Sequence, residues 1–410
     1  MKKITFLFFL IINSLLIAQE SDLYTKAVSC YNNRDFNCSK SEFQKLKYST
    51  NYAIRANANF YLAMSAANLY DSNTILLFKN FIDSFPESDK YDDAITGLSS
   101  YLIKKRDYDL VIYYLSKENL DTFSSQNRDQ AIFNRAYANF MLGHFDLADQ
   151  DFLQVLAQNE SDVLYDAAFY YACLLLQFDD LDGALNYFNL AQKSEVYIKK
   201  TPYYISYIMF LKKEYESLND YISIFIDDNK IYNHKELFLF SAKANFQLKN
   251  YRESIDFFEQ YKKMIDQFSD VQFYELGYSY YRLGNYEHAI NNFNKIIDLD
   301  NDISLYAYYY LAHSYLVVNK KIEAANAFKS SFDGFKILES TYNDHSSEEV
   351  AENAYYNFAL LCYDLDNSLY NPIDVFNQFI NHYPDSDKLP EVYNYLSLLY
   401  LSTSDYDNAI

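Results

Sequence analysis

The chain has 410 residues, of which 50% are hydrophobic and 22% are charged, so it can bury a substantial core. Its formal net charge of −21 weighs against nucleic-acid binding, which needs a basic surface, and against adhesion to anionic lipid. The charge would favour a basic partner, although it also serves solubility alone. The 45 Tyr, 33 Phe, six Gly and five Pro, without an alternating strand pattern, favour an all-helical structure in which aromatic rings fill the gaps between helices.

The first element is a predicted export signal over residues 1–18. Lys2 and Lys3 form a short basic region, Ile4–Ile17 is mostly apolar, and Ala18 is a small residue at a plausible cleavage point. An uncleaved membrane anchor is the alternative, but the apolar stretch is shorter than the roughly 18 residues that a span needs. We therefore expect an exported protein, in the periplasm or associated with the outer membrane. Leu16 leaves the cleavage site itself open.

The mature chain is expected to begin with a short tail, residues 19–22, and then a first helix pair centred on Phe36. Cys30 and Cys38 lie on either side of the turn of this pair, at similar heights on facing helices. In an oxidising compartment they could form a disulfide. Cys173 and Cys362 are predicted to be inert packing residues.

Similar helix pairs recur about every 34 to 37 residues, a period that indicates a solenoid. Weaker pairs centre on Tyr108 and Tyr215, and two pairs end in FIDSFPES (Phe81–Ser88) and FINHYPDS (Phe379–Ser386). The better-defined pairs carry small residues and aromatics at equivalent positions: Ala136, Gly143, Phe145, Ala148 and Phe152; Ala172, Leu181, Ala184 and Phe188; Ala242, Tyr251, Ser254 and Phe258; and Ala312, Tyr315, Ala324 and Phe328.

The clearest pair is Phe273–Asn301. Its apolar residues follow two helical stripes, and Gly284 interrupts them at a turn of about two residues, so the helices must be antiparallel. Gly277 and Ala289 are the small residues at the helix crossing, where a larger side chain would force the helices apart. One such pair leaves an apolar face uncovered, which is why these units stack in arrays.

Two irregularities interrupt the series near its end. A polar insertion, Ser340–Glu349, separates two pairs and is interpreted as a loop or an extended helix end. The final unit begins near Pro390 and stops at Ile410, inside its expected second helix, with Ala409 at the crossing position. We therefore expect that the chain is a fragment of a longer protein.

The pattern in Phe273–Asn301 resembles the tetratricopeptide repeat (TPR). Phe273, Leu276, Gly277, Tyr280, Gly284, Tyr286, Ala289 and Phe293 take eight of that family's motif positions, and Asn301 stands where its proline would be. The resemblance extends over nearly all of the chain after residue 22. It implies a right-handed superhelical solenoid of antiparallel helix hairpins, with about ten complete repeats in one continuous domain over residues 19–410. Most units lack the proline, and Leu218 replaces the expected alanine of the weakest unit.

In this family, fixed positions of each first helix line a concave groove that binds a partner. Carried over to this chain, these positions hold a run of aromatic residues, while the lysines and asparagine of the family's carboxylate clamp are absent. Two interpretations stay open: the rings bind a peptide or a glycan, or they pack on one another. The predicted groove residues are Phe133, Tyr137, Phe140, Phe169, Tyr203, Tyr207, Phe210, Tyr274, Tyr278, Tyr281 and Tyr309.

No pattern in the sequence indicates an enzyme. The six histidines are not paired at metal-ligand spacing, and the scattered glycines form no phosphate-binding loop. We predict no catalytic residue, metal or cofactor. The signal resembles those of Bacteroidetes-type bacteria, so the leading hypothesis is a non-enzymatic scaffold of the cell envelope that binds a protein or peptide, in envelope biogenesis or secretion. The alternatives are a binder of glycans or peptidoglycan fragments, or accessory repeats of a larger protein.

Overall fold

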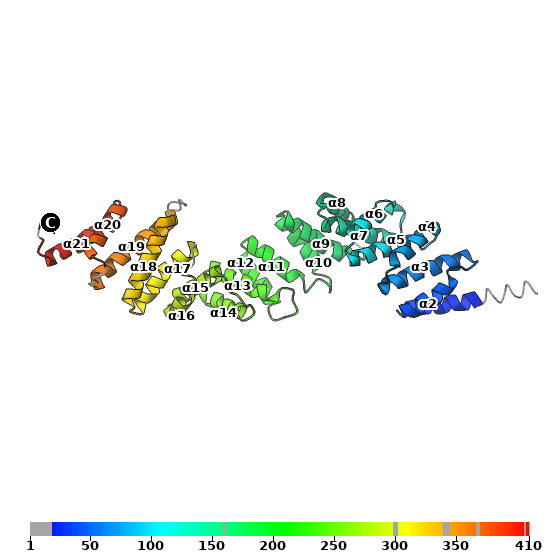
Figure 1. Ribbon diagram of the computed structural model, residues 1–410, viewed down its shortest axis with the longest axis horizontal. Coiled ribbons are helices and arrows are strands. Elements are labelled where there is room, and N and C mark those ends of the chain that lie inside the picture. Colours follow the sequence, from blue (N-terminus) through cyan, green and yellow to red (C-terminus); the bar gives the residue numbers. More distant parts are fainter. Residues whose placement is uncertain are drawn as a thin grey trace, which may run out of the picture. The chain divides into compact units, whose positions relative to one another are not determined.

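The computed structural model describes residues 19–158, 161–297, 302–338, 345–365, 370–405 and 407–409. Within these ranges the regular structure is helical and contains no strand, which confirms the predicted all-α array of helix hairpins (Figure 1). The predicted signal, residues 1–18, lies outside the described part. The contacts divide the chain into two compact units, residues 1–201 and 202–410. The single continuous domain therefore stays a prediction, and the units are described separately.

The first unit contains five helix hairpins. A helix over residues 19–32 pairs with α2 (Phe36–Leu46), and each later odd-numbered helix pairs with the even-numbered helix that follows it. The remaining elements are α3 (Tyr52–Asn68), α4 (Thr74–Ser84), α5 (Tyr91–Lys105), α6 (Tyr108–Leu115), the short 3₁₀ turn η1 (Leu120–Thr122), α7 (Ser125–Met141), α8 (Phe145–Leu156), α9 (Leu164–Gln177) and α10 (Leu181–Ala191).

The second unit repeats the same plan, with α11 beginning at the boundary between the units. Its last described helix is α21. Its helices are α11 (Thr201–Leu211), α12 (Tyr215–Ser223), α13 (His234–Gln247), α14 (Tyr251–Lys262), α15 (Asp270–Arg282), α16 (Tyr286–Phe293), α17 (Asp302–Val317), α18 (Lys321–Leu338), α19 (His345–Leu365), α20 (Pro372–His382) and α21 (Leu389–Ser402).

In each of the described turns that follow a first helix, one residue adopts the left-handed backbone conformation. At the clearest turn, Gly284 N–H donates to the Tyr281 carbonyl and Asn285 N–H donates to the Tyr280 carbonyl, the two bonds of a Schellman cap. Glycine adopts this conformation without strain, yet most of the turns use other residues. The left-handed turn residues are Arg34, Tyr70, Arg106, Gly143, Asp179, Lys213, Lys249, Gly284, Asn319 and Ser404.

The helix crossings are as tight as the small residues predict. A Cβ atom on Gly277 would lie 3.0 Å from Cε1 of Phe293, so residue 277 has no room for a side chain unless that ring moves. Ala289 and Phe293 are fully buried. The same is true of the predicted alanines and phenylalanines of the other well-defined hairpins, namely Ala136, Ala148, Phe152, Ala172, Ala184, Phe188, Ala242, Phe258, Ala312, Ala324 and Phe328.

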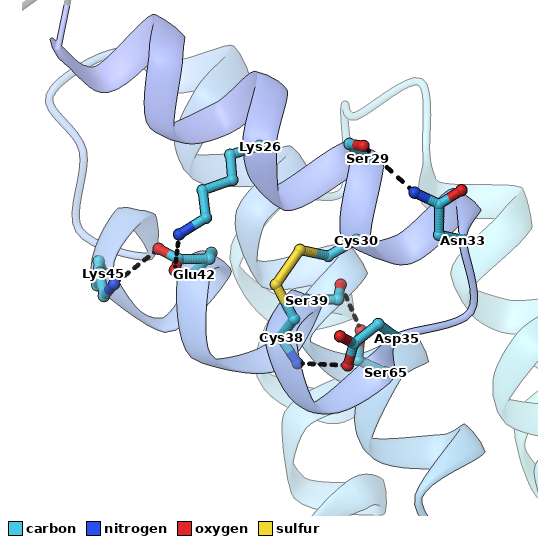
Figure 2. The surroundings of a disulfide bond; sticks show 10 residues. All are labelled: Lys26, Ser29, Cys30, Asn33, Asp35, Cys38, Ser39, Glu42, Lys45 and Ser65. Carbon is cyan, nitrogen blue, oxygen red and sulfur yellow. Dashed lines mark hydrogen bonds and ion pairs between the residues drawn. A yellow bond between two sulfur atoms is a disulfide. The ribbon is translucent and has the colours of Figure 1, made fainter.

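Cys30 and Cys38 are joined by a disulfide that ties the two helices of the first hairpin, with their Cα atoms 5.7 Å apart (Figure 2). Beside it, the Asp35 side chain caps α2 by accepting a hydrogen bond from the Cys38 N–H at 3.0 Å. On the same hairpin, Glu42 accepts from Lys26 and from Lys45, each at 2.7 Å, and these bonds lower the pKa of the Glu42 carboxyl. A covalent bond and an ion-pair bridge thus hold the first hairpin closed.

The two irregular regions differ in how much the structure describes. Residues 339–344 of the polar insertion lie outside the described part, and residues 345–349 belong to α19, the longest of the described helices. The expected second helix of the last unit is not formed in residues 407–409, which make a turn instead. No helix in the described ranges is both long and apolar enough to cross a membrane.

Candidate functional site

The predicted groove residues of α15 form an aromatic cluster with a ring from the next first helix. Tyr310 of α17 lies 4.8 Å from Tyr278, 5.2 Å from Tyr281 and 6.4 Å from Tyr274, measured between ring centroids. These four side chains are partly buried. We call such a cluster, formed between the first helices of successive hairpins, an aromatic tier.

A cation sits at the edge of this tier. Arg282 donates from Nη1 to the hydroxyl of Tyr278 at 3.0 Å and to that of Tyr251 at 3.3 Å, and its guanidinium carbon lies 5.0 Å from the Tyr251 ring centroid. Burial, followed by the neighbouring Tyr278, raises the pKa of Tyr310, so its phenol stays protonated at neutral pH. The tier therefore offers neutral hydroxyls and one cation, and no nucleophile.

The same arrangement occurs between α11 and α13. Phe240 of α13 packs on three predicted groove residues, with centroid distances of 6.0 Å to Tyr203, 6.1 Å to Tyr207 and 5.8 Å to Phe210. The rings again bury their faces against one another. Mutual packing, the second of the two interpretations of these residues, thus accounts for much of their surface.

In the first unit, Tyr170 of α9 completes a third tier. Its ring centroid lies 6.2 Å from that of Phe133 and 4.7 Å from that of Tyr137, both on α7. Phe140 turns toward its own second helix, where it lies 6.2 Å from Phe145. The predicted groove residues are therefore brought together in pairs and triplets.

Two predicted groove residues, Phe169 and Tyr309, contact a tier through the next residue, Tyr170 at 5.3 Å and Tyr310 at 5.2 Å, and make their other ring contacts outside it. Phe169 is buried and stacks on Tyr197 at 4.5 Å. Tyr309 packs beside His313 at 4.6 Å and on Phe328 of its own second helix at 6.0 Å. Burial lowers the pKa of His313, which favours the neutral imidazole in this apolar contact.

The residue that completes each tier is not among the groove residues predicted from the sequence. Tyr170, Phe240 and Tyr310 all stand nine residues before the left-handed turn residue of their own hairpin. Tyr61 of α3 has the same place and lies 4.8 Å from Tyr31 and 5.0 Å from Phe43. We call this the plug position, because its side chain fills the space over the preceding first helix.

Among the hairpins that follow another hairpin, those of α5, α7 and α15 have no aromatic residue at the plug position: they carry Gly97, Asn134 and Glu275. Glu275 is only 8% exposed, and its Oε2 atom has no hydrogen-bond partner. Lys243 lies 3.9 Å from that oxygen. Burial raises the pKa of the Glu275 carboxyl to about 7, against the opposing effect of Lys243.

Gly97 opens a pocket of about 300 Å³ on the first-helix face of the first unit. A Cβ atom on residue 97 would lie 2.6 Å from Sδ of Met64, so this sulfur covers the glycine closely. The walls come from the first helices of three successive hairpins, α3, α5 and α7. They are Met64, Ala67, Asn68, Asp93, Thr96, Gly97, Ser100, Tyr101, Lys104 and Asn127.

A ladder of polar side chains joins α5 to α7 beside this Gly97 pocket. Asn127 donates to Asp93 at 2.8 Å and accepts from the Thr96 hydroxyl at 3.1 Å, while Lys90 donates to the other Asp93 oxygen at 3.0 Å. Asn134, at the plug position of α7, donates to Ser100 at 3.0 Å. Hydrogen bonds therefore hold the polar wall of the pocket in place.

A second pocket, of about 250 Å³, lies on the other side of the same ladder. It shares Asp93 and Asn127 with the Gly97 pocket, and it also includes Ser161, whose buried hydroxyl has no hydrogen-bond partner. The other lining residues are Gln126, Gln130, Asp162 and Val163. This face of the first unit thus combines amides, carboxylates and hydroxyls with small cavities, which suits recognition of a peptide's polar groups.

Chemistry-bearing side chains are sparse in the part of the chain that the structure describes. No group of three or more His, Cys, Asp and Glu side chains there could hold a metal ion. Burial raises the pKa of the Cys173 thiol to about 12 and that of Cys362 to about 11, so neither sulfur is a ready nucleophile.

Comparison with known proteins supports the repeat assignment for one hairpin. Residues 272–303 match the family model described as tetratricopeptide repeat, and no curated protein matches the sequence. The part of the chain that this family model matches is α15, α16 and the start of α17.

Several solved structures are similar to the chain, each at low identity. The APC/C hetero-tetramer Cut9–Hcn1 is 13% identical over 97% of this chain and 93% of that chain, with a TM-score of 0.35. The C-terminal part of a TPR repeat-containing protein from Cytophaga hutchinsonii is 15% identical over 72% and 98%, with a TM-score of 0.33. A tetratricopeptide repeat protein from Parabacteroides merdae is 13% identical over 82% and 98%, with a TM-score of 0.27.

Proposed function

We propose that this protein is a non-enzymatic scaffold of the bacterial cell envelope, which binds a partner protein or peptide along the first-helix face of its hairpins. The observation that carries the proposal is the polar ladder between α5 and α7, which stands between two pockets and is built from the same face of successive hairpins. Array proteins of this kind use such extended faces to bind partners.

The location is part of the same proposal. The predicted signal over residues 1–18 supports export to the periplasm or to the outer membrane, where a role in envelope biogenesis or secretion would follow. The disulfide between Cys30 and Cys38 agrees with an oxidising compartment.

Glycan binding fits the structure less well. Sugar recognition by aromatic residues needs exposed ring faces, whereas none of the predicted groove aromatics is among the exposed large apolar side chains. Their rings are occupied by contacts within the tiers, such as Tyr278 with Tyr310 and Tyr207 with Phe240.

Site-specific photo-cross-linking in the producing cell tests the proposal. A photoreactive phenylalanine analogue would replace Lys104 and, in a second strain, Asn68, which are exposed residues at the rim of the Gly97 pocket. The matched control is Leu153, which is 43% exposed on the second helix α8. We expect one discrete protein adduct from both rim positions and none from Leu153. Adducts of equal yield at all three positions, or at none of them, would contradict a binding face on the first helices.

A further inference from the structure

We propose that the Gly97 pocket receives an aromatic side chain, of the tyrosine type, from an extended segment of the partner protein. This inference rests on the proposed function and specifies what the first unit recognises. Other hairpins of the chain have a ring at the plug position. In those hairpins, the ring fills the space over the preceding first helix.

The repeats themselves show which group fits over a first helix. Tyr61, Tyr170, Phe240 and Tyr310 each place a ring in this space, with ring-to-ring centroid distances of 4.7 to 6.4 Å within the three tiers and the first hairpin. The hairpin geometry is the same at α5, because Arg106 is its left-handed turn residue nine positions after Gly97. The pocket beside Gly97 therefore lies at the level of the repeat where these other hairpins place a ring.

Three small or flexible residues coincide at this one tier. Met64 stands where the α7, α11 and α15 hairpins have Tyr137, Tyr207 and Tyr278, and Ala67 stands where they have Phe140, Phe210 and Tyr281. With Gly97, three positions at this level thus carry no ring; the Met64 sulfur fills the place of a Cβ atom on residue 97, and a pocket of about 300 Å³ lies beside it. This volume is at the lower end of the range for ligand pockets and suits a single side chain.

The walls match a phenol rather than an aliphatic group. Met64 lines the floor, and a thioether makes favourable contacts with aromatic rings. At the rim, Asn68 uses its Nδ2 to donate to the Met64 carbonyl at 2.8 Å, and its Oδ1 has no hydrogen-bond partner among the described residues. Lys104 is exposed at the same rim. An acceptor and a cationic donor thus stand at the mouth, where a phenolic hydroxyl would lie.

Methionine-methyl NMR tests the pocket directly. The protein would be labelled with ¹³C-methyl methionine, and N-acetyl-tyrosinamide, N-acetyl-phenylalaninamide and N-acetyl-leucinamide would be titrated into it. Met64 lines the pocket, while Met141, Met209 and Met264 report from elsewhere in the same spectrum. We expect a saturable shift of the Met64 methyl signal alone, with the two aromatic amides and a Kd of about 1 mM, as one side chain can supply.

Two substitutions of alanine by phenylalanine on α3 supply a test and its matched control. Ala67→Phe fills the pocket from its own wall and should abolish the shift, whereas Ala53→Phe places a ring on an exposed part of α3 and should leave it unchanged. An equal Met64 shift with the leucine amide, shifts of all the methyl signals together, or no saturable shift up to about 50 mM would each overturn the aromatic assignment.

The two proposals fail in different ways. A specific cross-link at Lys104, together with no shift of the Met64 methyl signal, would support the proposed scaffold function and refute the aromatic occupant. A Met64 shift in a protein that yields no cross-link in the cell would instead support the pocket and count against a partner protein on this face.

Discussion

The buried carboxyl of Glu275 gives the sharpest prediction about stability. It occupies the plug position of α15, is only 8% exposed, and has one oxygen without a hydrogen-bond partner. Burial raises the pKa of Glu275 from the usual 4.5 to about 7, and the cation that opposes this shift is Lys243, 3.9 Å away. Folding therefore favours the protonated carboxyl.

The sign of the pH dependence follows from that shift. A carboxyl whose pKa is higher in the folded state contributes its full stabilisation below the unfolded pKa, near 4.5, and loses it as the pH rises through about 7. At about 1.4 kcal/mol per pKa unit, ionised Glu275 should cost the fold up to about 3 kcal/mol above pH 7. Glu275→Gln keeps the shape and removes the charge, so the variant should be more stable than the wild type at pH 8 and nearly equal to it at pH 5.

Hydrogen exchange of peptides from α15 is the right assay, since repeat arrays can unfold in sections rather than as a whole. Glu253→Gln on α14, an exposed site, serves as the control for loss of one negative charge. Protection of α15 in Glu275→Gln should exceed that of the wild type and of the control at pH 8. An equal difference at pH 5 and pH 8, or a variant less stable than the wild type at pH 8, would refute the burial argument.

Three further predictions concern the hairpins themselves. Ala289→Leu should lower the stability by about 1–3 kcal/mol in thermal unfolding, because residue 289 is fully buried at the crossing; Ala53→Leu, on an exposed surface, should not. Arg106→Gly should raise the stability by about 1 kcal/mol, since Arg106 holds a φ of 60° that costs an ordinary residue energy, while Arg106→Val should lower it. Removal of the Cys30–Cys38 disulfide, which closes a loop with a sequence separation of 8, should destabilise the first hairpin by about 2–3 kcal/mol; the melt should shift with reductant in the wild type and stay fixed in Cys30→Ser with Cys38→Ser.

The hairpins were predictable because their packing leaves a local trace in the sequence. Ala289 and Phe293 must be small and large, respectively, whatever the neighbouring hairpin contains, because they meet the partner helix of the same hairpin. Most of the turns left no such trace. Of the left-handed turn residues, only Gly143 and Gly284 are glycines. Arg106 and Lys213 adopt the same conformation, although their residue types do not predict it.

The polar ladder was hidden for a different reason. Asp93, Thr96 and Asn127 are single polar residues on two helices, and such residues usually lie on a solvated face. Only the approach of α5 to α7 brings Asn127 within 2.8 Å of Asp93 and within 3.1 Å of Thr96. The distance between successive hairpins is a tertiary quantity, and a periodicity within one helix does not contain it.

The plug position combines both lessons. It lies one residue from a predicted groove position, which is about 100° around the helix. The sequence therefore predicts Tyr309 as the groove residue, whereas Tyr310 is the ring that completes the tier. Once the register is known, the exceptions become informative: the position that holds a ring in the hairpins of α3, α9, α11, α13 and α17 holds Gly97, Asn134 and Glu275 in three others. Gly97 opens a pocket, Asn134 extends the polar ladder, and Glu275 buries a carboxyl at an energetic cost. Local departures from a packing rule that the rest of the chain obeys are where function is expected, and here two of the three, Gly97 and Asn134, lie on the face proposed to bind the partner.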